Sequence, residues 1–235
     1  MTAYSMRPKA LFFDVNETLL DLAEVKISVN RALDNRPELA ALWFPTLLHH
    51  SLVSTVAEQF RPFGEIAVAA LMMVAKNNGI DLSEETAKQA IQPILSAPPH
   101  PDVYSALARL RKQDFQMGVL TNSSRSAMAQ QIKTAKMEDL FDFMFSVEDL
   151  GTYKPHRKVY QWAAEQRQIQ PKDGMMIAAH GWDVGGAAWA GMRAAFVARP
   201  GQSLYPLAPA PEIIGADMED IADRLILLRR LSRFS

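Results

Sequence analysis

The chain has 235 residues, of which 49% are hydrophobic and 22% are charged, values typical of a folded globular protein. Lysine and arginine number 25 against 26 aspartates and glutamates, so the net charge of -1 gives no bulk attraction for nucleic acid or anionic membranes. The absence of cysteine excludes disulfides, thiolate metal ligands and cysteine nucleophiles. The N-terminus does not resemble a signal peptide, and no run approaches ~18 apolar residues. We therefore expect a cytoplasmic protein with no nucleic-acid or membrane partner.

Five short apolar runs predict buried β-strands. Helical patterns separate the later strands: Ser123 or Ser124 caps a helix that runs to about residue 135, and another helix covers 156–167. Strands that alternate with helices predict a parallel sheet with right-handed crossovers, and hence a Rossmann-like α/β core. The predicted strands are 10–15, 116–122, 141–147, 175–179 and 194–197.

Residues 20–97 interrupt this alternation and are predicted to be almost entirely helical. The clearest helix covers 65–78 and ends at Gly79, and Ser83 begins another. A proline-rich segment, 96–101, is a predicted linker because proline cannot extend a helix. We therefore expect a core formed by residues 1–19 and 98–235, with an inserted α-helical cap at 20–97.

Polar side chains follow four of the predicted strands. Asp14 ends the first, Thr121 and Asn122 end the second, Lys154 lies in the loop after the third, and Asp183 follows the fourth. Taken singly, each is typical of a turn or a helix cap. Because open parallel sheets bind ligands at the carboxyl ends of their strands, we expect these groups to converge on one site. A lysine beside a carboxylate keeps it ionised, as a nucleophile requires.

These motifs resemble the haloacid dehalogenase superfamily, and within it the type II 2-haloacid dehalogenases with a helical cap. The resemblance covers nearly the whole chain. Residues 12–19 match the first motif, with Asp14 in the nucleophile position, and 119–122 match the second. The third corresponds to 153–155, and Trp182-Asp183 to the fourth. Each motif alone is weak evidence, but the four in this order are specific.

The resemblance implies hydrolytic dehalogenation of a small 2-halocarboxylic acid, without a cofactor. Asp14 would displace the halide and form an ester, which water would hydrolyse to a 2-hydroxy acid. Lys154 would hold Asp14 ionised, Thr121 and Asn122 would position the substrate carboxylate, and Asp183, aided by His180, would orient water. Thr18 is also expected to be catalytic, and the expected substrate-binding residues are Asn16, Phe44, Leu48, Phe63, Tyr160 and Trp182.

Two departures distinguish the chain from the phosphatases of the superfamily. Asn16 replaces the acid that protonates the leaving group, and Ala179 replaces an acid that helps to hold Mg²⁺. We therefore expect no metal ligands. A Mg²⁺-dependent phosphatase with Glu17 as a relocated acid remains the alternative.

A third departure concerns the anion site. The dehalogenases carry a cap arginine after a Leu-Trp pair, where this chain has Phe44. Phenylalanine cannot donate to a halide. We favour His180 as the replacement donor, and the other candidates are His49, His50, Arg61 and the Trp182 indole. A member without dehalogenase activity also remains open, as do the preferred halogen, the chain length, the stereochemistry and the oligomeric state, for which a homodimer is an expectation.

Overall fold

The computed structural model describes residues 7–231, and for 229–231 the backbone only. Six parallel strands form one sheet in the order β3-β2-β1-β4-β5-β6. The chain runs outward from β1 on one side through β2 and β3, and on the other through β4, β5 and β6. The end of β1 therefore lies where the strand order reverses, the usual position of a ligand site. The strands are Ala10–Phe13, Met117–Thr121, Phe143–Ser146, Gly174–Ala178, Arg193–Val197 and Ile213–Gly215.

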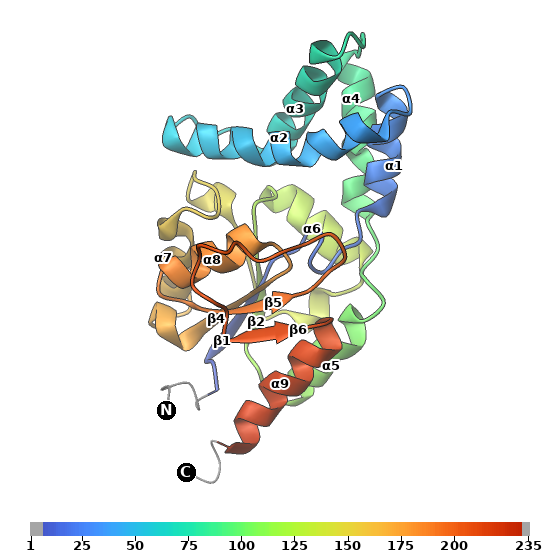
Figure 1. Cartoon of the computed structure of the whole chain (residues 1–235). Coiled ribbons are helices and arrows are strands. Elements are labelled where there is room, and N and C mark those ends of the chain that lie inside the picture. The colour runs from blue at the N-terminus through green and yellow to red at the C-terminus, as the bar shows by residue number, and fades with distance from the viewer. Residues whose placement is uncertain (1–6, 232–235) are drawn as a thin grey trace.

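The predicted α/β class and its five strands are confirmed. The sixth strand, β6, was not predicted because its three residues form no apolar run long enough to stand out. Helices α5 and α9 pack against each other beside the sheet, and α7 packs against α8 (Figure 1). The Ser124 side chain caps α6 by accepting from the backbone N–H of Ala127 at 3.3 Å. The helices of the core are α5 Val103–Lys112, α6 Arg125–Thr134, α7 Arg157–Gln166, α8 Gly181–Trp189 and α9 Met218–Leu231, with short 3-10 helices at Glu138–Leu140, Val147–Asp149 and Pro171–Asp173.

The segment between β1 and α5 is helical, as predicted, and forms a separate layer over the core (Figure 1). Its two ends are adjacent, because Leu20 forms an antiparallel bridge with Pro99. We propose the division into a cap of 20–97 and a core of 1–19 and 98–235, of which residues 1–6 and 232–235 lie outside the described residues. The layer contains α1 Ala23–Ala32, α2 Pro37–Val56, α3 Phe63–Asn77, α4 Glu84–Ile91 and a 3-10 helix, η1, at Gln92–Ser96.

Helix α2 packs on α3 and buries Trp43 and Leu47, and the Trp43 indole N–H donates to the Ala67 carbonyl at 3.0 Å. By length and composition alone, α2 is long and apolar enough to cross a membrane, with a mean hydropathy of 1.2. No uninterrupted apolar run marks α2 in the sequence, because Glu38, His49 and His50 interrupt the helix. One such helix is weak evidence for a membrane span, since helices of soluble proteins pass the same test.

The close packing of β2 against β3 depends on Gly118. A Cβ atom there would lie 2.2 Å from both the ring and the carbonyl oxygen of Phe143. We expect Gly118→Ala to lower the free energy of unfolding by about 1–3 kcal/mol, measured by urea denaturation. Gly64→Ala is the matched control, because no heavy atom lies within 4 Å of its Cβ position. Equal stabilities of the two variants would contradict this account of the packing.

Candidate active site

Asp14 is the centre of the site and follows β1 directly. Its side chain is buried, and both carboxylate oxygens are hydrogen-bonded. Oδ1 accepts from Lys154 Nζ at 3.0 Å, whereas Oδ2 accepts from Thr18 Oγ1 at 2.7 Å and lies 3.1 Å from His180 Nδ1. Burial alone would raise the pKa of Asp14, but the charges of Lys154 and His180 and the Thr18 hydrogen bond lower it well below its usual range. Asp14 is therefore anionic at neutral pH.

Lys154 joins Asp14 to a second buried carboxylate, Asp183. Its Nζ atom lies 2.6 Å from Asp183 Oδ2, and the other oxygen, Oδ1, accepts from the Tyr160 hydroxyl at 2.6 Å. Burial would lower the pKa of Lys154, but the two carboxylates raise it. Both oxygens of Asp183 are engaged, and its side chain is fully buried. The structure thus places Lys154, Asp183 and Tyr160 together as a support for Asp14.

His180 connects Asp14 to Glu17. Its Nδ1 atom lies 3.1 Å from Asp14 Oδ2, and its Nε2 atom lies 3.1 Å from Glu17 Oε2. Burial would lower the pKa of His180, but its hydrogen bonds to the two carboxylates raise it to about 9. The imidazole is therefore protonated at neutral pH, and both of its N–H groups donate to carboxylates.

Phe44 and Trp182 both stack on this imidazolium. Phe44 of α2 stacks on His180 with ring centroids 5.9 Å apart, and Trp182 stacks with centroids 5.2 Å apart. Aromatic faces carry partial negative charge, so both rings favour the protonated form. At position 44 the chain thus has a phenylalanine in place of an arginine, and the Phe44 ring covers the His180 cation, which belongs to the core.

Glu17 is the residue whose role the sequence did not predict. It adopts a left-handed backbone conformation with φ of 59°, which costs energy for a residue with a side chain. Its carboxylate is held by Lys26 Nζ at 2.6 Å and Gln202 Nε2 at 3.3 Å, in addition to His180. These contacts offset the strain and hold Glu17 against the imidazole. An acid three residues after the nucleophile was the only signal in the sequence.

Two buried donors at the site have no hydrogen-bond partner. One is Asn122 Nδ2, and the other is the indole N–H of Trp182. The oxygen of Asn122 accepts from the Lys154 backbone N–H at 3.0 Å, and the Thr121 hydroxyl accepts from the Ser123 N–H at 3.1 Å. A buried donor without a partner is costly, so the two N–H groups are suited to donate hydrogen bonds to a bound anion.

The other predicted residues fall into three groups. Asn16 is buried and already satisfied, since it donates to Ser123 Oγ at 3.2 Å and accepts from Gln131 Nε2 at 2.8 Å. Leu48 and Phe63 each line a cavity at the boundary between cap and core. The three candidate donors of the cap, His49, His50 and Arg61, are not among the residues that line these cavities.

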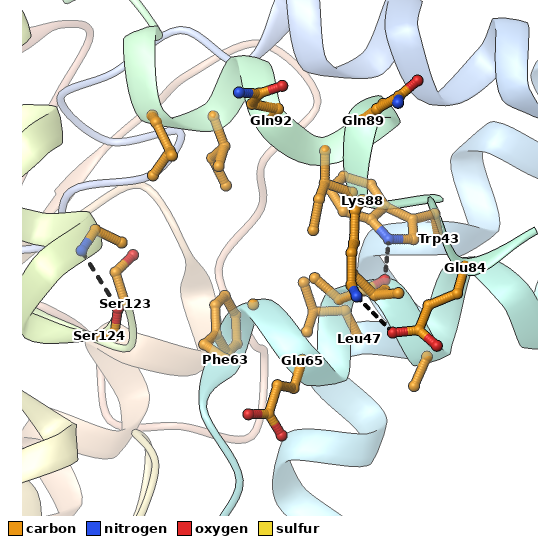
Figure 2. Close-up of a pocket in the computed structure, with 18 of the residues that line it drawn as sticks. Trp43, Leu47, Phe63, Glu65, Glu84, Lys88, Gln89, Gln92, Ser123 and Ser124 are labelled. Carbon is orange, nitrogen blue, oxygen red and sulfur yellow. Dashed lines mark hydrogen bonds and ion pairs between the residues drawn. The ribbon is translucent and has the colours of Figure 1, made fainter. Parts of the chain in front are cut away.

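Two cavities flank the site. The larger, termed the cap–core cleft, has a volume of about 940 Å³ and lies between α3, α4 and η1 of the cap and the start of α6. Figure 2 shows Ser123 and Ser124 of the core on one side of this cleft and Trp43 and Lys88 of the cap on the other. The smaller, termed the His180 cavity, has a volume of about 570 Å³. Its lining includes Glu17, Lys26, Phe44, Leu48, His180 and Trp182.

A sequence profile of the haloacid dehalogenase-like hydrolases matches residues 11–197. The chain belongs to this family. (S)-2-haloacid dehalogenase H-109 of Pseudomonas putida is 29% identical over 224 residues, which cover 94% of this chain and 100% of that protein. Haloacetate dehalogenase H-2 of Moraxella sp. (strain B) is 24% identical and covers 91% and 96% of the two chains.

A solved structure of a dehalogenase-like hydrolase has the same fold. L-2-haloacid dehalogenase from Xanthobacter autotrophicus, with chloropropionic acid covalently bound, superposes with a TM-score of 0.85 at 24% identity, over 94% of this chain and 98% of that one. The parallel sheet and its helices therefore have the fold of this dehalogenase structure.

A Bacillus subtilis protein with the same fold is bound to magnesium in its solved structure, with a TM-score of 0.73 at 18% identity. The residues here do not fit that ion. Asn16 already uses its amide oxygen, and Ala179 offers no side-chain oxygen. Lys154 and His180 also place two positive charges beside Asp14, where a metal would need to bind. Among residues 7–231, no cluster of three histidines or acids is arranged to bind a metal.

The raised pKa of His180 makes stability depend on pH. A histidine whose pKa is higher in the folded state than in the unfolded state stabilises the folded protein. This stabilisation is complete below the unfolded-state pKa of 6.5 and is lost as the pH rises through the folded-state pKa of about 9. The shift corresponds to about 3 kcal/mol. We expect wild-type stability in urea to fall between pH 6.5 and 9.5, and Glu17→Gln to lose roughly half of that pH dependence. Identical pH dependence in the two proteins would show that Glu17 does not hold the charge.

Proposed function

We propose that the protein is a hydrolytic dehalogenase that acts on small 2-halogenated acids through an ester on Asp14. The observation that carries this proposal is a buried carboxylate that is kept ionised by Lys154, beside a protonated histidine. A poorly hydrated carboxylate is a strong nucleophile because no water shell must be removed before attack. The names of the relatives support the same chemistry, since those of Pseudomonas and Moraxella are haloacid and haloacetate dehalogenases.

In the first step, an oxygen of Asp14 attacks the carbon that carries the halogen. The carbon–halogen bond breaks as the carbon–oxygen bond forms, and the halide leaves with the electron pair. Lys154 and Thr18 hold the carboxylate in one orientation through hydrogen bonds of 3.0 and 2.7 Å. Thr121 and Asn122 position the substrate at the end of β2.

The departing halide needs hydrogen-bond donors, and His180 is not suited to supply them. Both of its N–H groups already donate to Asp14 and Glu17. The unpartnered N–H groups of Asn122 and Trp182 are available instead. The halide therefore binds to these two donors, which gain a partner as the negative charge develops.

In the second step, His180 activates water. Alkylation removes the charge on Asp14, so the pKa of His180 falls and its proton leaves through the His180 cavity. Nδ1 then accepts a proton from a water that attacks the ester carbonyl, and this proton passes to the departing alkoxide. The acid re-formed on Asp14 returns its proton to His180. The balance is one water consumed and one halide, one hydroxy acid and one proton released.

Glu17 and Asp183 are positioning residues in this scheme. Glu17 orients the imidazole and stabilises its charge, the arrangement that a buried acid provides in hydrolases with a histidine base. Asp183 is less suited to activate water than the sequence suggested, because Lys154 and Tyr160 occupy both of its oxygens. It holds Lys154 in place instead.

Replacing the nucleophile tests the covalent step. Asp14→Asn should abolish halide release while leaving the fold intact, because the amide is nearly the same size but a poor nucleophile. Single turnover of the wild type in ¹⁸O water should place label in Asp14, detected by peptide mass spectrometry. Label found only in the product would indicate direct attack by water.

Replacing His180 separates the two steps. The His180→Asn variant should still form the ester, but it should hydrolyse the ester ~10²-fold more slowly than the wild type, or slower still. This is the scale of losing a catalytic base. Rapid-quench measurement should then show a burst of one halide per enzyme, with the alkyl group retained on Asp14. Asp183→Asn is the control and should slow ester formation itself, without a burst. If His180→Asn turns over at the wild-type rate, the base is another group.

The alternatives make different predictions. A phosphatase would hydrolyse a generic phosphate ester in a reaction that EDTA abolishes, whereas dehalogenation should persist in EDTA because the residues at the site do not fit Mg²⁺. A member without dehalogenase activity would release no halide from fluoro-, chloro- or bromoacids, and Asp14→Asn would then change nothing on this panel.

We also propose a cytoplasmic homodimer. The support is the composition and the exposed apolar side chains of α2, which a second copy would cover. Light scattering of the purified protein measures the oligomeric state directly. These side chains are Leu42, Leu52, Val53 and Val56.

A further inference from the structure

Every positive charge found at the catalytic centre is already paired. Lys154 contacts the carboxylates of Asp14 and Asp183, and His180 contacts those of Asp14 and Glu17. Lys26, at the edge of the His180 cavity, pairs with Glu17 at 2.6 Å. Three carboxylates thus balance three cations. A carboxylate on the substrate would add a negative charge without a counterion, and the departing halide would add a second.

The cap–core cleft is also unfavourable for an anion. The charged residues that line it are Glu65, Glu84, Glu85 and Lys88, and Lys88 pairs with Glu84 at 2.6 Å. Two glutamates therefore remain as excess negative charge, which repels an anionic substrate. The remaining walls are mostly apolar and include Trp43, Leu47, Phe63, Val68, Met72 and Ile94.

The cleft reaches the catalytic loops through two side chains of the core. Ser123 and Gln131 line it, and both are hydrogen-bonded to Asn16, two residues after the nucleophile. Phe63 lines it from the cap side (Figure 2). Its volume of about 940 Å³ far exceeds what a substrate of two or three carbons would fill. The cleft is therefore suited to the non-reacting, apolar part of a larger substrate.

We propose that the protein also dehalogenates uncharged organic halides, namely 2-haloamides, with an apolar chain bound in the cap–core cleft. The proposal rests on the dehalogenase function proposed above and names a further substrate class for the same site. The chemistry is unchanged: Asp14 forms the carbon–oxygen bond, the halide leaves with its electron pair, and water hydrolyses the ester. A 2-haloamide and water give a 2-hydroxyamide, halide and one proton.

The direct test compares 2-bromohexanamide with 2-bromohexanoate, with halide release as the readout. After correction for the uncatalysed reaction of each compound, kcat/KM for the amide should equal or exceed that for the acid. It should also rise about threefold for each methylene added between the three- and six-carbon amides, as an apolar cleft requires. A lower kcat/KM for the amide, or no gain with chain length, overturns the proposal. If neither compound nor the short bromoacids release halide, the dehalogenase function fails as well.

Two variants test the cleft itself. Glu65→Lys should raise kcat/KM for the acid severalfold and leave the amide unchanged, whereas Glu165→Lys makes the same charge change on α7, away from the cleft, and should affect neither. Ala69→Trp fills the cleft from an exposed position on α3 and should abolish the gain with chain length. If Glu65→Lys and Glu165→Lys change kcat/KM for the acid equally, the cleft does not repel the acid. If kcat/KM still rises with chain length in Ala69→Trp, the chain does not bind in the cleft. Either result contradicts the proposal.

Discussion

The site depends on keeping the carboxylate of Asp14 ionised where little water reaches it. Burying a single charge is very unfavourable, so the carboxylate requires cations, and those cations require further carboxylates. Lys154 is compensated by Asp183, and His180 is compensated by Glu17. These groups come from the segments that follow β1, β3 and β4 and from the first turn of α8. The parallel sheet is what brings them together, since the carboxyl ends of adjacent strands meet at one edge.

Phe44 stands where the resemblance implies a cap arginine, and a cation of the core, His180, lies directly beneath it. Phe44 does not leave a gap, because it stacks on His180 and covers an imidazolium that follows β4. The positive charge near the nucleophile thus comes from the core rather than from the cap. This exchange has a chemical consequence: an arginine is always charged, whereas a histidine can lose its proton once the ester has formed and then act as a base.

Much of the fold could be predicted from the sequence, because buried parallel strands appear as apolar runs and the helix caps at Ser83 and Ser124 are local signals. The residues at strand ends were also predictable, since the topology alone brings Asp14, Lys154 and Asp183 to one edge. The role of Glu17 was not. It depends on a left-handed backbone conformation and on contacts with Lys26 and Gln202, which are distant in the sequence. The stacking of Phe44 depends on how the cap is placed over the core, which no sequence pattern specifies.

The central claim is that His180 is a cation in the free enzyme and becomes a neutral base when Asp14 is alkylated. The protein has five histidines, so ¹⁵N-labelled imidazoles can be assigned by substitution. NMR titration should show both nitrogens of His180 protonated at pH 7 with a pKa near 9 in the wild type. Because Glu17→Gln lowers this pKa by itself, the effect of the ester is measured within that variant: its alkylated form should show a lower His180 pKa than its free form. A neutral His180 at pH 7 in the free enzyme would contradict the account.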